Sequence, residues 1–240
     1  MLSRRTIPKD LAGILFDKDG TLVDYDKTWY PLNLEAARIA GSGDSDLQQK
    51  ILIACGSDPE TGKTLADSVF AAASTKEIAE HMISIGSDFG KQELTMALDR
   101  LYSEGARNSV STCDLQILME SLRAQGYQLG IASSDNENSI STTVKVHEID
   151  EHIEFIAGYD SGHGIKPGPG MVHGFCSKIG CSPSQVIVVG DNRHDIEMGR
   201  SAEAGATIGV LSGTGSKETL GNYADFILES VSELPGLLTA

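Results

Sequence analysis

The chain has 240 residues, 40% of them hydrophobic, which is enough to bury the core of one large α/β domain and a smaller accessory one. It carries 19 Lys and Arg against 34 Asp and Glu, a formal charge of −15. A field of this sign repels polyanions, so we expect no nucleic-acid partner. An acidic protein that binds a small anion needs local positive charge, from a metal ion, a lysine or a helix N-terminus.

The cysteines and the N-terminal sequence indicate the cellular compartment in which the protein is expected. The cysteines form no CxxC pair and are expected to be free thiols in a reducing environment: Cys55, Cys113, Cys176 and Cys181. The basic start with Arg4 and Arg5 has no apolar region typical of a signal peptide. No apolar run approaches the ~20 residues of a membrane span. These features predict a soluble, cytoplasmic protein with no membrane partner.

Short apolar runs rich in β-branched residues predict buried parallel strands at residues 12–16, 128–132, 155–157, 186–189 and 207–210. Residues 225–228 are typical of an edge strand, followed by a short final helix. Between the strands, amphipathic patterns predict helices at residues 114–125, 169–179 and 195–204. This alternation predicts an α/β fold, a Rossmann-like parallel sheet with helices on both faces.

Residues 28–107 differ from the rest, because they carry helical patterns and little strand character. We expect helices at residues 32–40, 46–54, 64–73, 75–85 and 91–102. The segment follows the first predicted strand and precedes the second, so it is interpreted as an all-helical cap domain inserted after that strand. The predicted division is a catalytic core of residues 1–26 and 108–240 and a cap of residues 27–107.

Two acidic motifs each follow a predicted buried strand. Asp17 and Asp19 come directly after the first strand, and Asp191 follows the fourth, with Asp195 four residues later. Either motif alone is as typical of an acidic turn as of a metal site. Because the carboxyl ends of parallel strands meet at one edge of a sheet, the four side chains are expected to converge. Their repulsion favours a bound cation, and carboxylate oxygens are ligands that suit Mg²⁺.

Two further residues at strand ends favour phosphate chemistry. Ser133 ends the second strand, where a hydroxyl and its backbone N–H can donate to phosphoryl oxygens. Lys166 lies in the loop after the third strand and can offset negative charge on a phosphate or a nucleophile. His194 lies beside the predicted metal site, but a solvent-facing position is equally consistent with its context, so it receives no role.

The ordered segments FDKDGTL, GIASSD, GIKP and VGDNRHD resemble the motifs of the haloacid dehalogenase-like hydrolase superfamily, and most closely its phosphoglycolate phosphatase-like branch with a helical cap. The resemblance covers nearly the whole chain. It implies that Asp17 is the nucleophile and Asp19 the general acid/base. It also implies that Mg²⁺ is held by the Asp17 carboxylate, the Asp19 backbone carbonyl and Asp191.

The same resemblance implies that Asp195 orients the metal shell and that Ser133 and Lys166 hold the phosphoryl group. Gly20 and Thr21 would shape the loop after the nucleophile. The branch often has Thr-Asn at the second motif, where this chain has Ser133 and Ser134. The hydroxyl is therefore kept, whereas the contact from the neighbouring amide is not carried over.

The expected function is an enzyme, a Mg²⁺-dependent phosphatase that hydrolyses a small phosphorylated metabolite such as phosphoglycolate through an aspartyl-phosphate. Its second Asp argues for phosphoryl transfer, since dehalogenation in this superfamily does not use that residue. A phosphomutase similar to β-phosphoglucomutase and a non-catalytic ligand-binding or regulatory member are the alternatives. The substrate stays open, and the protein is expected to be a monomer or a homodimer.

Overall fold

The computed structural model describes residues 7–239 and contains a six-stranded parallel sheet in the order β5-β4-β1-β6-β7-β8. The predicted α/β fold with a parallel sheet is confirmed, and each predicted strand is present with its ends shifted by no more than two residues. The strands are β1 (Gly13–Phe16), β4 (Gln128–Ala132), β5 (Ile153–Ala157), β6 (Val186–Gly190), β7 (Ala206–Val210) and β8 (Phe226–Leu228).

Helices cover both faces of the sheet because successive strand residues point to opposite sides. Ile14 and Phe16 of β1 face one side, in a buried cluster with residues of α6 (Leu115–Ala124), α7 (Glu137–Val146) and α11 (Leu234–Leu238). Leu15 faces the other, in a cluster with α8 (Gly170–Ile179) and α9 (Arg193–Ser201). Helix α7 was not predicted, because its run of Asn, Ser and Thr has weak helix propensity. Burial of Ile140 and Val144 stabilises it.

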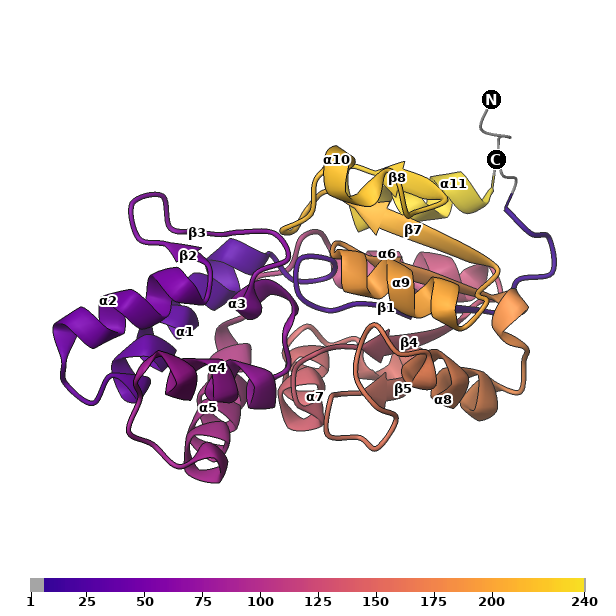
Figure 1. Cartoon of the computed structure of the whole chain (residues 1–240). Coiled ribbons are helices and arrows are strands. Elements are labelled where there is room, and N and C mark those ends of the chain that lie inside the picture. Colours follow the sequence, from indigo (N-terminus) through magenta and orange to yellow (C-terminus); the bar gives the residue numbers. More distant parts are fainter. Residues whose placement is uncertain (1–6, 240) are drawn as a thin grey trace.

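The segment between β1 and β4 forms a second lobe with its own buried hydrophobic cluster, beside the sheet in Figure 1. Its helices are α1 (Tyr25–Ala40), α2 (Ser45–Ala54), α3 (Val69–Ala72), α4 (Thr75–Ile85) and α5 (Lys91–Gly105). Short helical turns follow α5 and lie elsewhere in the sheet-bearing lobe: η1 (Ala106–Asn108), η2 (Asp150–His152), η3 (Pro183–Gln185), η4 (Val231–Glu233) and α10 (Lys217–Leu220).

The prediction of a purely helical segment was wrong at residues 57–73. Strands β2 (Ser57–Asp58) and β3 (Lys63–Thr64) pair as an antiparallel hairpin, and the helix expected at residues 64–73 is reduced to α3. Asp67 has a φ of +55°, a left-handed conformation that interrupts a helix. Ser68 then caps α3 by accepting a hydrogen bond from the Ala71 N–H.

Helix α1 begins seven residues before the predicted start at residue 32, because Asp24 caps it by accepting a hydrogen bond from the Lys27 N–H at 3.1 Å. The added turns place Tyr25, Trp29 and Asn33 at a spacing of four, which puts their side chains on one helix face. All three are buried. The same helix face lines the pocket at the carboxyl edge of the sheet.

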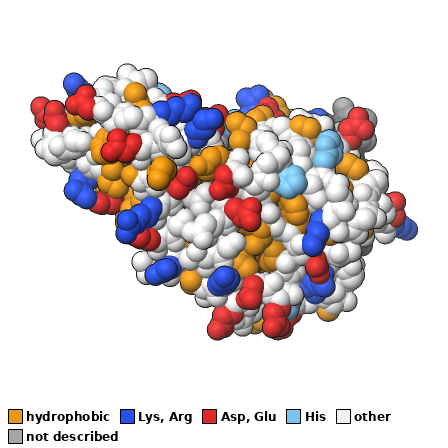
Figure 2. Space-filling view, turned by 90° about the horizontal axis from the view of Figure 1, so that it is seen from below, with side chains coloured by type: hydrophobic (Ala, Val, Ile, Leu, Met, Phe, Trp, Pro, Cys, Tyr) orange, Lys and Arg blue, Asp and Glu red, His pale blue; other side chains and the backbone are white. Residues whose placement is uncertain are grey.

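The surface carries charges of both signs. On the face in Figure 2, Lys and Arg side chains lie among Asp and Glu over both lobes. None of the helices within residues 7–239 is long and apolar enough to cross a bilayer. The four cysteines, all in the described part of the chain, are unpaired.

Candidate active site

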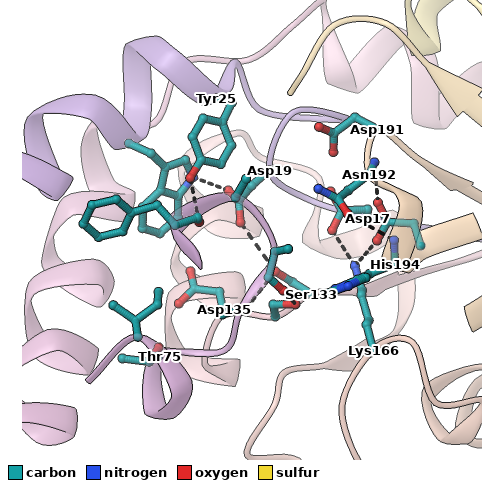
Figure 3. A pocket seen from close by; sticks show the side chains of 18 of the residues that line it. Asp17, Asp19, Tyr25, Thr75, Ser133, Asp135, Lys166, Asp191, Asn192 and His194 are labelled. Atoms are coloured by element: carbon teal, nitrogen blue, oxygen red, sulfur yellow. Dashed lines mark hydrogen bonds and ion pairs between the residues drawn. The ribbon is translucent and has the colours of Figure 1, made fainter. Parts of the chain in front are cut away.

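The residues singled out at the strand ends meet in one pocket at the carboxyl edge of the sheet. Asp17, Ser133 and Asp191 follow the adjacent strands β1, β4 and β6, and Lys166 lies in the loop after β5. All four line the pocket together with Asp19 and Asp195 (Figure 3). Parallel strands end at the same edge, so the topology brings together residues that are far apart in the sequence.

Asp17 and Lys166 form the buried centre of this site. Lys166 Nζ donates to Asp17 Oδ1 at 2.6 Å and to Asp195 Oδ1 at 2.6 Å. The second carboxylate oxygen of Asp17, Oδ2, is buried and has no hydrogen-bond partner within residues 7–239. Burial and the neighbouring Asp195 raise the pKa of Asp17 to about 7, against the lowering effect of Lys166. A carboxylate with one oxygen anchored and the other free can attack a substrate or bind a cation.

The acidic cluster has the composition and spacing of a metal site. Among residues 7–239, carboxylate oxygens of Asp17, Asp191 and Asp195 lie within 4.8 Å of one another, and all three residues are buried. Burial, followed by the charges of Asp17 and Asp195, raises the pKa of Asp191 well above its ordinary value. One lysine does not neutralise three carboxylates. The oxygen-only donor set and the unpartnered Asp17 Oδ2 fit a hard divalent cation such as Mg²⁺.

Asp191 is held in place by the loop that follows β7. The Thr214 N–H donates to Asp191 Oδ2 at 2.7 Å, and the Thr214 hydroxyl lies 3.2 Å from the same oxygen. Gly20, with φ +87°, and Gly213 leave room for this carboxylate, since a Cβ on either would lie within 2.5 Å of it. The sequence analysis gave no role to Gly213 or Thr214, because a Ser-Gly-Thr loop after a strand carries no specific signal.

Asp19 lies on the side of the pocket that faces the helical lobe. Its Oδ1 accepts from Trp29 Nε1 at 2.5 Å and pairs with Lys18 Nζ at 2.8 Å, while the Ser133 hydroxyl lies 3.4 Å from Oδ2. Burial raises the pKa of Asp19, whereas Lys18 lowers it. Figure 3 shows Asp17, Lys166 and Asp191 on one side, Tyr25 and Thr75 on the other, and Asp19 between them. Asp19 is thus placed to contact a group that projects towards the helical lobe.

The model of the haloacid dehalogenase-like hydrolase family matches residues 14–209, which is most of the chain. This chain belongs to that family. The pyrophosphatase PpaX of Bacillus velezensis is 27% identical over 230 residues, covering 94% of this chain and 95% of the relative. Pyrophosphatases of the same name from Listeria monocytogenes match over about half of their own length.

Solved structures share the fold of this haloacid dehalogenase-like hydrolase. One described as a predicted phosphoglycolate phosphatase from Haemophilus somnus has a TM-score of 0.71 at 20% identity, covering 95% of this chain and 98% of the other. A putative β-phosphoglucomutase from Thermotoga maritima has a TM-score of 0.65 at 16% identity, covering 95% and 99%. At these identities the likeness concerns the fold alone. The suspected superfamily is confirmed, and the structural likeness extends over both lobes.

Lys18, Asp19 and Asp135 form a buried network of ion pairs that was not predicted from the sequence. Lys18, 1% exposed, pairs with Asp135 at 2.9 Å as well as with Asp19, and its Nζ lies 4.7 Å from the centre of the Trp29 ring. Burial lowers the pKa of Lys18, but the two carboxylates outweigh this effect and leave the pKa raised. The available signal was the acidic residue two positions after Ser133, which shares its strand-end loop.

The helical lobe forms the opposite wall of the pocket. Its lining includes Tyr25, Trp29 and Asn33 of α1, Phe70 of α3 and Tyr102 of α5. Sequence reasoning missed this wall, because its residues come from helices whose mutual packing was unknown. His194, left without a role above, also lines the pocket, and its buried Nδ1 has no hydrogen-bond partner.

The predicted site residues therefore divide into two groups. Six line the pocket: Asp17, Asp19, Ser133, Lys166, Asp191 and Asp195. Gly20 and Thr21 lie outside its lining and are buried in the loop that follows Asp17. Gly20 packs against Asp191, and the backbone oxygen of Thr21 accepts a hydrogen bond from the Thr112 hydroxyl at 2.9 Å. Their direct contact with a substrate stays a prediction.

Proposed function

We propose that this haloacid dehalogenase-like hydrolase is a Mg²⁺-dependent phosphatase of small phosphorylated metabolites that works through an aspartyl-phosphate on Asp17. The observation that carries the proposal is the free Asp17 Oδ2, buried at the pocket beside Lys166 and two further carboxylates. The names of the curated relative and of one structural neighbour, a pyrophosphatase and a predicted phosphoglycolate phosphatase, support phosphoryl transfer to water.

The reaction has two displacement steps at phosphorus. A carboxylate oxygen of Asp17 attacks phosphorus, the bond to the leaving oxygen breaks, and Asp19 gives its proton to the departing alkoxide. Asp19 then removes a proton from water, which attacks the aspartyl-phosphate and releases phosphate and the Asp17 carboxylate. The short contacts of Trp29 and Lys18 with Asp19 keep this carboxyl group fixed during both proton transfers.

The remaining residues bind and orient. Lys166 and the Ser133 hydroxyl would hold phosphoryl oxygens, and Asp195 positions Lys166 through its 2.6 Å contact. Mg²⁺ would be held by the Asp17 carboxylate, the Asp19 backbone carbonyl and Asp191. When bound, it would supply charge neutralisation for the phosphoryl oxygens. Thr214 orients Asp191 for this purpose.

We further propose that residues 27–107 form a cap over a catalytic core of residues 1–26 and 108–240. The separate hydrophobic cluster of this segment supports the division. A pocket with one wall from each lobe supports the role, because such a wall can exclude water and select the leaving group. Phosphoglycolate, implied by resemblance, and pyrophosphate, from the name of the relative, are the first substrates to test.

The test is phosphate release from a panel of phosphorylated metabolites with Mg²⁺ or with EDTA. We expect Mg²⁺-dependent release that Asp17→Asn abolishes and Asp88→Asn, at an exposed position of the helical lobe, leaves unchanged. Full activity of Asp17→Asn would refute the proposed nucleophile. Transfer of phosphate to a second sugar hydroxyl with little free phosphate would instead support the phosphomutase alternative, and metal-independent binding with no turnover would support a non-catalytic role.

A further inference from the structure

We infer that the leaving group of the substrate is an uncharged, hydroxyl-bearing one, of polyol or sugar type, and that Tyr102 and Asn33 in the helical wall recognise its oxygens. The inference rests on the proposed phosphatase function and narrows its substrate class. It follows from two buried polar groups without partners and from the distribution of charge around the pocket.

Tyr102 offers a hydroxyl that no residue among 7–239 binds. It lies on α5, is 3% exposed and lines the pocket, yet its hydroxyl oxygen has no hydrogen-bond partner. The Trp29 ring packs edge-on against it at 5.0 Å and fixes its orientation. Burial raises the pKa of Tyr102, so the phenol stays protonated and can donate. An unsatisfied buried hydroxyl costs about 1–3 kcal/mol, which a ligand oxygen would offset.

Asn33 offers a second donor on the same wall. It is 2% exposed and lines the pocket, and its amide Nδ2 has no hydrogen-bond partner in the described part of the chain. The neighbouring Tyr25 hydroxyl donates its own proton to the Phe70 carbonyl at 2.7 Å. Burial raises the pKa of Tyr25, and the nearby Asn33 amide lowers it. The two side chains nevertheless do not reach hydrogen-bond geometry. Two side chains that line the pocket therefore carry neutral donors without a partner among residues 7–239.

The charges around the pocket disfavour a second anionic group. Within residues 7–239, Lys166 is the only Lys or Arg that lines the pocket, and it already pairs with Asp17 and Asp195. Lys18 lies behind Asp19 and is likewise paired with two carboxylates. A carboxylate or second phosphate on the leaving group would find no free cation on the helical wall and would approach acidic side chains.

The surroundings of the two donors suit a carbon skeleton that carries hydroxyl groups. The wall also presents the apolar side chains of Phe70, Ala72 and Ile78. An adjoining groove shares Ala72, Ala73, Lys166 and His194 with the pocket. Asp67 and Glu77 also line it, and its lysine is the one already paired with Asp17 and Asp195, so an anionic substituent is again disfavoured. Polyols and sugars combine apolar C–H surface with oxygens that accept hydrogen bonds.

The first experiment compares leaving groups that share the same phosphate: glycerol phosphate, hexose phosphates, phosphoglycolate, pyrophosphate and phenyl phosphate. We expect the best uncharged, hydroxylated ester to exceed phosphoglycolate and pyrophosphate in kcat/KM by at least about tenfold. The opposite order, with an anionic leaving group preferred, would overturn the inference.

The second experiment removes one hydroxyl with Tyr102→Phe. We expect kcat/KM for the preferred polyol or sugar phosphate to fall about tenfold, and kcat/KM for phenyl phosphate to stay unchanged. The melting temperature should not fall, because the hydroxyl has no partner in the free protein. Tyr30→Phe, on α1 outside the pocket lining, is the matched control. An equal loss on both esters would contradict recognition by Tyr102.

A binding measurement separates failure of this inference from failure of the proposed chemistry. Trp29 is the only tryptophan and lines the pocket, so its fluorescence reports occupancy without turnover. In the Asp17→Asn variant with Mg²⁺ present, glycerol or hexose phosphate should bind at least about tenfold tighter than phosphoglycolate. Tighter binding of phosphoglycolate would refute the inference whether or not the wild-type protein releases phosphate.

Discussion

The charged side chains at this site contact one another, so each affects the charge state of its neighbours. Lys166 contacts two of three clustered carboxylates and is itself 6% exposed, so its ammonium group is largely shielded from solvent. Burial lowers the pKa of Lys166, yet Asp17 and Asp195 outweigh it and leave the pKa raised. The lysine thus stays charged and is the main counter-charge for Asp17 when no metal is bound.

Lys166→Met keeps an unbranched side chain only one atom shorter and removes this charge. We expect kcat/KM to fall by at least about a hundredfold, because the nucleophile and the phosphoryl group both lose their cation. Stability in EDTA should fall by about 3–5 kcal/mol, the usual result of breaking a buried ion pair. Steady-state kinetics and urea unfolding measure both effects. Lys217→Met, at an exposed ion pair with Glu229, is the control, and wild-type kinetics in Lys166→Met would refute the assigned role.

The hydroxyl of Thr214 is predicted to tune metal affinity through Asp191. Thr214→Val keeps the backbone N–H contact at 2.7 Å and removes the hydroxyl contact at 3.2 Å. We expect the Mg²⁺ concentration for half-maximal activity to rise about tenfold, as is typical when a partner of a metal ligand is lost. Thr142→Val serves as the control, since the Thr142 hydroxyl bonds within α7 to the Asn138 carbonyl. An unchanged Mg²⁺ requirement would contradict the prediction.

At the scale of elements, α1 connects the two walls of the pocket. It starts one residue after Asp24, so its first turns stay close to the loop that carries Asp17 and Asp19. Trp29 uses this position to donate to Asp19, while its ring contacts Tyr102 of α5. The packing of the helical lobe and the orientation of the proposed acid/base are therefore mechanically linked.

Trp29→Phe tests this link by keeping an aromatic ring and removing the indole N–H. We expect kcat to fall about tenfold, because a hydrogen bond to a charged group contributes about 1.5–3 kcal/mol. Trp29→Ala should lose more, because the packing against Tyr102 is lost as well. Both are measured by steady-state kinetics on the same ester. Equal, wild-type kcat values in the two variants would show that Asp19 needs no support from α1.

At the scale of the whole molecule, the acidic cluster links stability to pH and metal. Burial and Asp195 raise the pKa of Asp17 to about 7, so the folded protein binds this proton more tightly than the unfolded chain. Without metal, the stability contributed by this group is therefore complete below about pH 4 and is lost as pH rises through about 7. A cation bound at the proposed site would replace this proton, because it needs the ionised carboxylate.

Mg²⁺ is accordingly predicted to raise the melting temperature more at about pH 8 than at about pH 5. Calorimetry with Mg²⁺ and with EDTA at the two pH values measures the difference. Asp17→Asn should reduce both the Mg²⁺ effect and its pH dependence, because the substituted amide does not titrate. A Mg²⁺ effect of the same size at both pH values would contradict binding at this cluster.

Local sequence was sufficient to predict those structural features that depend on residues close together along the chain. Buried strands are short apolar runs, so their positions and the residues directly after them could be predicted. Parallel strands share a carboxyl edge, so one pocket could be expected from the sequence alone to contain Asp17, Ser133, Lys166 and Asp191. Helix α7 and the β2–β3 hairpin could not, because tertiary burial and pairing override weak local preferences there.

The sequence by itself determined the α/β class, the superfamily and six residues that line the pocket, because each depends on local patterning and on the order of motifs. The tertiary structure alone decided which side chains complete the site. Lys18 meets Asp135 across 117 positions, and Thr214 reaches Asp191 across 23. Asn33 and Tyr102 share a wall only because α1 and α5 pack together. Such contacts follow from the packing of distant elements, and local sequence patterns do not specify which side chains meet.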